Sequence, residues 1–203
     1  NIYVVGYKKD GVSPLDKIYI YSNVIRDSGE PQFGTGILVK DLTSNHSVYI
    51  YNNLIYNNPR PEIEFFSYSN ASPYPYSGRF VGIFNNTIWH NSQEPAIMAP
   101  IWNGDNWNNG EVSIKNNIIV NTGAGPVLTL FNGIRPTEDY SYNLYYYPNN
   151  GKLGVPAGSN DYAQGASTNP LFMAEPSEGA YSINTGWLLP NSPAKDAGLD
   201  LSA

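Results

Sequence analysis

Hydrophobic and polar residues alternate in short runs that recur along the chain. Four eight-residue segments align without gaps, at residues 18–25, 48–55, 81–88 and 112–119, and a weaker copy follows at 140–145. Each full copy has β-branched apolar residues at its first, third and eighth positions and an asparagine at its sixth. Alternation with a period of two predicts a β-strand with one buried face. The pattern therefore predicts a strand, a sharp bend and a second strand in every copy.

An asparagine stands at the bend of every copy. These residues are 26 to 33 positions apart: Asn23, Asn53, Asn86, Asn117 and Asn143. Asparagine tolerates the left-handed backbone conformation that a sharp turn requires. When copies stack, asparagine side chains can also hydrogen-bond to one another along the stack. We therefore predict a structural asparagine ladder and do not expect these side chains to bind a ligand.

A third strand is predicted in each unit, at residues 36–41, 62–66, 96–102 and 126–131. Three short strands in each unit of about 30 residues, with no helical periodicity between them, are typical of a solenoid. The alternation on these third strands turns the following side chains inward: Ile37, Val39, Ile63, Phe65, Ile97 and Ala99. It turns the following side chains outward: Lys40, Glu62, Glu64, Phe66, Met98 and Trp102.

The spacing of isoleucine and asparagine at residues 50–57 and 114–121 resembles the repeat of the right-handed parallel β-helix superfamily, the fold of pectate-lyase-like proteins. The stretches at 169–172 and 191–198 resemble the tail of many bacterial members. The resemblance implies an all-β chain. We expect a right-handed parallel β-helix of about five rungs over residues 1–145 and an irregular C-terminal cap over 146–203. Because an uncovered first rung would expose sheet edges, we also expect further rungs before Asn1, so that a missing N-terminal part of the same protein is a possible partner. The alternative is that a docked partner chain or a loop from residues 6–17 covers this rung.

Composition narrows the choice of partner. Lys and Arg number 11 against 17 Asp and Glu, a net charge of −6, which argues against nucleic acid as a ligand. No apolar run approaches the roughly 20 residues that span a membrane. The absence of cysteine excludes disulfides and thiolate metal sites. A charged fraction of only 14%, with many Gly, Pro, Asn and Tyr, favours an extracellular or cell-surface protein whose partner is a polysaccharide.

Aromatic residues gather in the two longest loops, at residues 67–79 and 102–110. Aromatic faces stack on the apolar faces of sugar rings, and neighbouring amides and carboxylates hydrogen-bond the hydroxyl groups. We therefore expect a carbohydrate-binding platform on these loops, with the alternative that the same rings only cover the solenoid wall. The candidate binding residues are Tyr68, Tyr74, Tyr76, Trp102 and Trp107.

The outward face of the third strand offers a catalytic alternative, carried by Lys40, Glu62 and Glu64. In a lyase, Lys40 would remove the proton next to a uronate carboxylate while Arg60 or Arg79 neutralised that carboxylate. In a glycoside hydrolase, a pair of carboxylates would be the catalytic groups. The remaining alternative is an ordinary solvated ion pair.

The hydrolase pair would be Glu62 with Glu64, or Asp41 with Glu64 from the next rung. The signature motifs of polygalacturonase-like hydrolases, well-known pectate lyases and related epimerases are all missing. His46 and His90 lie in different turns and no motif pairs either with a nucleophile, so we expect turn or surface roles. No cofactor is expected. The only possible metal is calcium, either near Asp105 and Glu111 or at Glu62 and Glu64.

Three functions are therefore open. The first is binding of a plant-cell-wall-type polysaccharide such as cellulose, as in the tapirins, bacterial surface proteins with a β-helical core that this chain resembles. The second is a polysaccharide lyase or glycoside hydrolase acting on the outward face of the third strand. The third is a phage-type or structural adhesin, which would favour a trimer and a longer solenoid.

Overall fold

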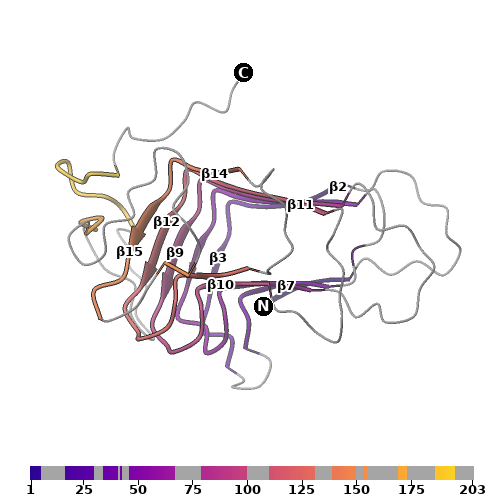
Figure 1. The fold of residues 1–203 in the computed structure, drawn as a ribbon, viewed down its shortest axis with the longest axis horizontal. Coiled ribbons are helices and arrows are strands. Elements are labelled where there is room, and N and C mark those ends of the chain that lie inside the picture. Colours follow the sequence, from indigo (N-terminus) through magenta and orange to yellow (C-terminus); the bar gives the residue numbers. More distant parts are fainter. Residues whose placement is uncertain are drawn as a thin grey trace, which may run out of the picture.

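The chain folds into three parallel β-sheets wound around one core. A computed structural model describes residues 1–5, 17–29, 34–40, 42, 46–66, 79–99, 110–130, 139–149, 153–154, 169–172 and 186–194. In Figure 1, two of the sheets run along opposite sides of the core, and the third sheet joins them at one edge.

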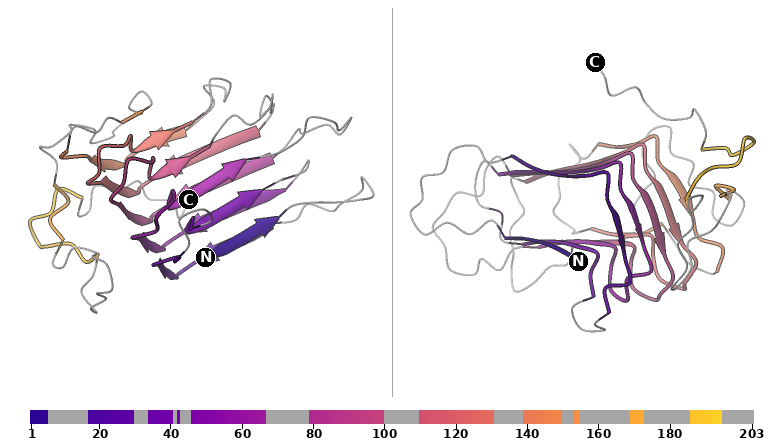
Figure 2. Two further views of the ribbon diagram at one scale, coloured as in Figure 1. Left: turned by 90° about the horizontal axis from the view of Figure 1, so that it is seen from below. Right: turned by 180° about the vertical axis from the view of Figure 1, so that it is seen from behind.

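The strands follow one another through the three sheets in a fixed cycle. Sheet A contains β1 (Ile2–Val5), β4 (Ile37–Lys40), β7 (Ile63–Phe66), β10 (Ile97–Met98) and β13 (Leu128–Thr129). Sheet B contains β2 (Lys17–Tyr21), β5 (Ser47–Tyr51), β8 (Arg79–Phe84), β11 (Gly110–Lys115) and β14 (Asp139–Ser141). Sheet C contains β3 (Val24–Arg26), β6 (Leu54–Tyr56), β9 (Thr87–His90), β12 (Ile118–Asn121) and β15 (Leu144–Tyr146). Each strand pairs in parallel with the strand three places later, so the predicted β-helix of about five rungs is confirmed (Figure 2).

The core is a stack of identical or similar side chains from successive rungs. Ile20, Ile50, Ile83 and Ile114 occupy one register position in sheet B and are at most 5% exposed. The inward residues predicted for the third strands are confirmed, because Ile37, Val39, Ile63, Phe65, Ile97 and Ala99 are all at most 1% exposed. Stacking buries each rung against its neighbours, which no single rung can do alone.

The predicted asparagine ladder is present at the corner between sheets B and C. The Asn86 Oδ1 atom accepts from the backbone and side-chain nitrogens of Asn53 at 3.0 Å, and the Asn86 Nδ2 atom donates to Asn117 Oδ1 at 3.0 Å. The left-handed residue is not the ladder asparagine but the one before it: Ser22, Asn52, Asn85, Asn116 and Tyr142 have φ between 54° and 59°. The ladder asparagine is thereby free to turn its amide inward along the stack.

The C-terminal residues pack on the outer face of sheet C. Phe172 and Leu188 form an antiparallel bridge, and Phe172 lies 5.7 Å from Trp89 between ring centroids. Together with Tyr56 and Val120 they make a second apolar cluster outside the solenoid core. This cluster fixes the position of the residues on either side of Leu188. Among the described residues, no helix is long and apolar enough to cross a membrane.

Candidate functional site

The five aromatic residues predicted to bind carbohydrate cannot be placed. The following five lie outside the described residues: Tyr68, Tyr74, Tyr76, Trp102 and Trp107. Asp41 and Asp105 also lie outside them, and the side chains of Arg79 and Glu111 are not described. Their binding role stays a prediction, and so does calcium binding. No group of three or more metal-ligating side chains occurs within the described ranges.

A groove of about 400 Å³ runs along the outer corner between sheets B and C. Its floor consists of Val24, Leu54 and Thr87, which share one register position in the first three rungs of sheet C. Beside the floor, the exposed left-handed residues Asn52 and Asn85 stand in a row along the stack. The groove therefore combines a strip of two apolar side chains and a threonine with a row of amides one rung apart, about 4.8 Å.

Trp187 forms a wall of this groove and is 58% exposed. It is held there by its neighbours in the chain. Leu188 packs into the second apolar cluster, and Gly186 lies against the groove floor with a φ of +78°. A side chain at Gly186 would place its Cβ only 2.9 Å from Leu54 Cδ1. A glycine is therefore needed for the segment to approach the floor so closely, with the indole held at the rim.

Columns of aromatic rings border the groove on the outer face of sheet B. Tyr21 and Tyr51 stack with ring centroids 5.0 Å apart, and Tyr19 and Tyr49 stack at 5.1 Å. Tyr19 and Tyr21 are 52% and 53% exposed. Phe80 continues one column, 5.4 Å from Tyr49. The aromatic columns lie next to the groove, because Tyr21 and Tyr51 directly precede the groove residues Ser22 and Asn52 in the chain.

Among the described residues that line the groove, none has an ionisable side chain. The nearest charged residues along β3 are Arg26 and its sequence neighbour Asp27, which form an ion pair at 2.8 Å. An uncharged cleft with amides and an exposed indole is suited to hydrogen-bonding hydroxyl groups and to stacking on a sugar ring. Trp187 and the tyrosines were not predicted from the sequence, although the alternation that turns Ile18 and Ile20 inward turns Tyr19 and Tyr21 outward.

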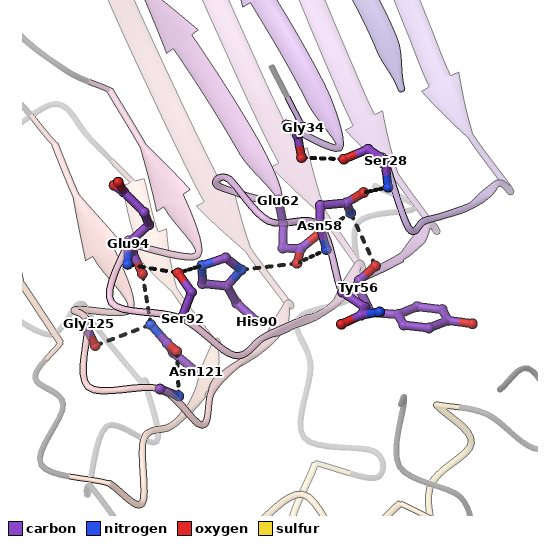
Figure 3. Close-up of polar contacts among 12 residues, drawn as sticks. Ser28, Gly34, Tyr56, Asn58, Glu62, His90, Ser92, Glu94, Asn121 and Gly125 are labelled. Carbon is purple, nitrogen blue, oxygen red and sulfur yellow. Dashed lines mark hydrogen bonds and ion pairs between the residues drawn. The ribbon is translucent and has the colours of Figure 1, made fainter. Parts of the chain in front are cut away.

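A polar network fills the opposite corner, between sheets C and A (Figure 3). Glu62 was expected to face solvent, but it is completely buried, and its Oε1 atom lies 3.1 Å from His90 Nδ1. Asn58 donates to the same carboxylate from its backbone and side-chain nitrogens. The expectation was wrong because β7 begins at Ile63: Glu62 belongs to the corner, where strand alternation does not apply.

His90 is also completely buried, which corrects its expected turn or surface role. Its Nε2 atom lies 3.0 Å from Ser92 Oγ, and that oxygen accepts from the backbone nitrogen of Glu94 at 2.9 Å. His46 is likewise buried, at 4% exposure. Burial raises the pKa of the Glu62 carboxyl above its usual value. The hydrogen bond and the charge of His90 oppose that rise, and so do the hydrogen bonds from Asn58.

Lys40 and Glu64 are not opposite one another. In the register of β4 and β7, Glu64 lies beside Leu38, and Lys40 lies beside Phe66. Glu64 is only 5% exposed, contrary to the solvent-facing position expected, and it accepts from Thr35 Oγ1 at 3.1 Å. Burial raises the pKa of Glu64, and Glu94 adds to the rise, whereas Thr35 and Arg60 oppose it. Glu62 and Glu64 thus have separate partners, and their catalytic role stays a prediction.

Comparisons with protein-family models, curated proteins and solved structures gave no match to this chain. The interpretation of its function therefore depends on the residues of the groove and of the polar corner.

Proposed function

We propose that this chain binds a plant-cell-wall-type polysaccharide, for example cellulose, along the outer corner between sheets B and C. The observation that carries the proposal is the groove lined by Trp187, the amides of Asn52 and Asn85, and an apolar floor. The bordering tyrosine columns extend the same surface over sheet B.

Each part of the groove matches one part of a sugar chain. The exposed Trp187 indole offers a flat apolar face for the C–H groups of a pyranose ring. The amides of Asn52 and Asn85 both donate and accept, as hydroxyl groups require. Because these two asparagines follow the rungs, an extended polymer lying along the stack would meet them at successive positions.

The proposal includes an extracellular or cell-surface location and distant membership of the pectate-lyase-like or tapirin-like β-helix proteins. A role for the loop aromatics, Trp102 and Tyr74 among them, is compatible with it and is tested separately. A lyase or hydrolase using Lys40, Glu62 and Glu64 receives less support, because the two carboxylates are buried and bonded to different neighbours.

The experiment is a pull-down on insoluble cellulose and xylan, with pectin gel as an anionic polymer. Trp187→Ala removes the indole, and Asn52→Gly removes an amide while allowing the left-handed backbone. Tyr3→Ala is the matched control, because Tyr3 is 59% exposed but lies in sheet A. Supernatants are assayed for reducing ends and for unsaturated products.

We expect Trp187→Ala to weaken binding at least about tenfold, as removal of a stacking aromatic anchor does, while Tyr3→Ala binds like the parent. Loss of binding only in Trp102→Ala or Tyr74→Ala would move the site to the loops. If the parent protein binds none of these polymers, the proposal is refuted. Product release abolished by Lys40→Ala or Glu64→Ala would instead establish an enzyme.

A further inference from the structure

Three side chains in the polar corner form a hydrogen-bonded series that the groove does not use. Ser92 Oγ lies 3.0 Å from His90 Nε2, and His90 Nδ1 lies 3.1 Å from Glu62 Oε1. Glu62 directly precedes β7, His90 ends β9, and Ser92 lies in the link to β10. A hydroxyl, an imidazole and a carboxylate in this order and at these distances are the groups of a nucleophilic hydrolase.

The hydrogen-bond partners of Ser92, His90 and Glu62 favour the proton positions that attack by the serine hydroxyl requires. A carboxylate at Nδ1 favours the tautomer with hydrogen on Nδ1, so the lone pair of Nε2 faces the serine. Ser92 Oγ already accepts from the Glu94 amide, which leaves its own hydrogen to point at Nε2. Asn58 holds the Glu62 carboxylate from two nitrogens.

The fold does not require a histidine at this corner. In the register of sheet C, His90 lies beside Asn121, and Asn121 closes its own turn with its amide alone. In Figure 3, Asn58 and Asn121 flank His90 along the stack. Asparagine therefore occupies this corner in the rungs on both sides, and His90 adds a basic nitrogen beside the Ser92 hydroxyl, which also accepts from the Glu94 backbone within the turn.

The backbone of Ser92 is in close contact with the next rung, and the residue is partly exposed. Gly125 donates its backbone N–H to the carbonyl of Ser92, and Gly123 packs so closely that a Cβ there would lie 1.9 Å from that carbonyl oxygen. Ser92 is only partly buried and stands between the exposed residues Asn91 and Gln93. The imidazole behind it is shielded from water.

We propose that Ser92 is the nucleophile of an esterase site, with His90 as general base and Glu62 as the group that orients it. The substrate class is a small carboxylic ester. Ser92 Oγ forms a bond to the acyl carbon, its proton passes to His90 Nε2, and the ester C–O bond breaks as the leaving alcohol takes that proton. Water then attacks the acyl-serine, gives a proton to His90, and the carboxylic acid leaves with the serine hydroxyl restored. This activity is independent of polysaccharide binding.

The test is labelling of the whole chain with a fluorophosphonate probe, with the modified peptide located by mass spectrometry, alongside hydrolysis of 4-nitrophenyl acetate. Ser92→Ala removes the nucleophile, and His90→Asn installs the residue found at this corner in the adjacent rungs. Ser28→Ala is the matched control, because the Ser28 hydroxyl donates to the Gly34 carbonyl at the same corner of the first described rung. Circular dichroism and thermal melting verify that each variant is folded.

We expect one probe per chain at Ser92 in the parent and in Ser28→Ala. Labelling should be absent in Ser92→Ala, and His90→Asn should lower labelling and ester hydrolysis at least about a hundredfold, the usual contribution of a general base. If His90→Asn does not fold, Glu62→Gln takes its place. An unlabelled Ser92 in the folded parent, or unchanged labelling in folded His90→Asn, would overturn the proposal and leave the corner purely structural.

Discussion

The asparagine ladder should make a large and position-dependent contribution to stability, which Asn86→Ala measures. Asn86 is 1% exposed, and its side chain makes four hydrogen bonds. Its Oδ1 atom accepts twice from Asn53, and its Nδ2 atom donates to the Ile50 carbonyl and to Asn117 Oδ1.

The expected cost follows from what the truncation leaves behind. The side chains of Asn53 and Asn117 keep other partners, since Asn53 Nδ2 still donates to Ile20 O and Asn117 Oδ1 still accepts from the backbone nitrogen of residue 86. The Asn53 N–H and the Ile50 C=O lose these bonds inside the corner. At about 1–3 kcal/mol for the buried Asn53 N–H left unsatisfied and about 1 kcal/mol for the bond lost at the Ile50 carbonyl, we expect a loss of about 2–4 kcal/mol.

The matched control is Asn23→Ala at the first described position of the ladder. Asn23 is half-buried and donates to the exposed Tyr21 carbonyl and to Asn53 Oδ1. Water can replace bonds at this open end, so we expect a loss of only about 1 kcal/mol. Urea denaturation followed by circular dichroism at one protein concentration gives both unfolding free energies.

Equal losses for Asn86→Ala and Asn23→Ala would refute the reasoning, because they would show that burial of the ladder does not set its contribution. A loss below about 1 kcal/mol at Asn86 would also refute it.

Three further predictions concern the core and the polar corner. Ile83→Asn, at a fully buried position, should lower the unfolding free energy by about 4 kcal/mol or more, because it adds an unpaired amide and removes packing; an unchanged melting temperature would show that Ile83 does not face inward. The pKa of Glu64 is higher in the folded protein than in the unfolded chain, where it is 4.5. Its contribution to stability is therefore fully present below pH 4.5 and is lost as the pH rises through the pKa of the folded state. Glu64→Gln should therefore gain stability relative to the parent between acidic and neutral pH, and a difference independent of pH in urea titrations would contradict this. Gly123→Ala would place a Cβ 1.9 Å from the Ser92 carbonyl oxygen. The variant should therefore have a lower melting temperature than the parent and slower labelling of Ser92. An unchanged melting temperature would show that the two corners are not in tight contact.

The fold could be predicted from the sequence because the repeat encodes it directly. Ile20, Ile50 and Ile83 recur at one offset from Asn23, Asn53 and Asn86, and stacking of equal rungs is the only way to bury all of them. The prediction failed first at the corners. Glu62 was assigned to a strand by extending the alternation one residue too far, and the structure places it in a buried turn.

The candidate sites depended on contacts that no sequence pattern contains. Glu62, His90 and Ser92 belong to two rungs, and only the winding of the chain brings the carboxylate within 3.1 Å of the imidazole. Trp187 lies 133 residues from Leu54 by number, yet Gly186 packs against the Leu54 side chain. The local sequence determined strands, bends and the inward face, because backbone geometry and burial act on near neighbours. The tertiary structure alone decided which side chains meet across rungs and where the C-terminal residues pack, because those contacts depend on registers and surfaces that exist only once the solenoid has formed.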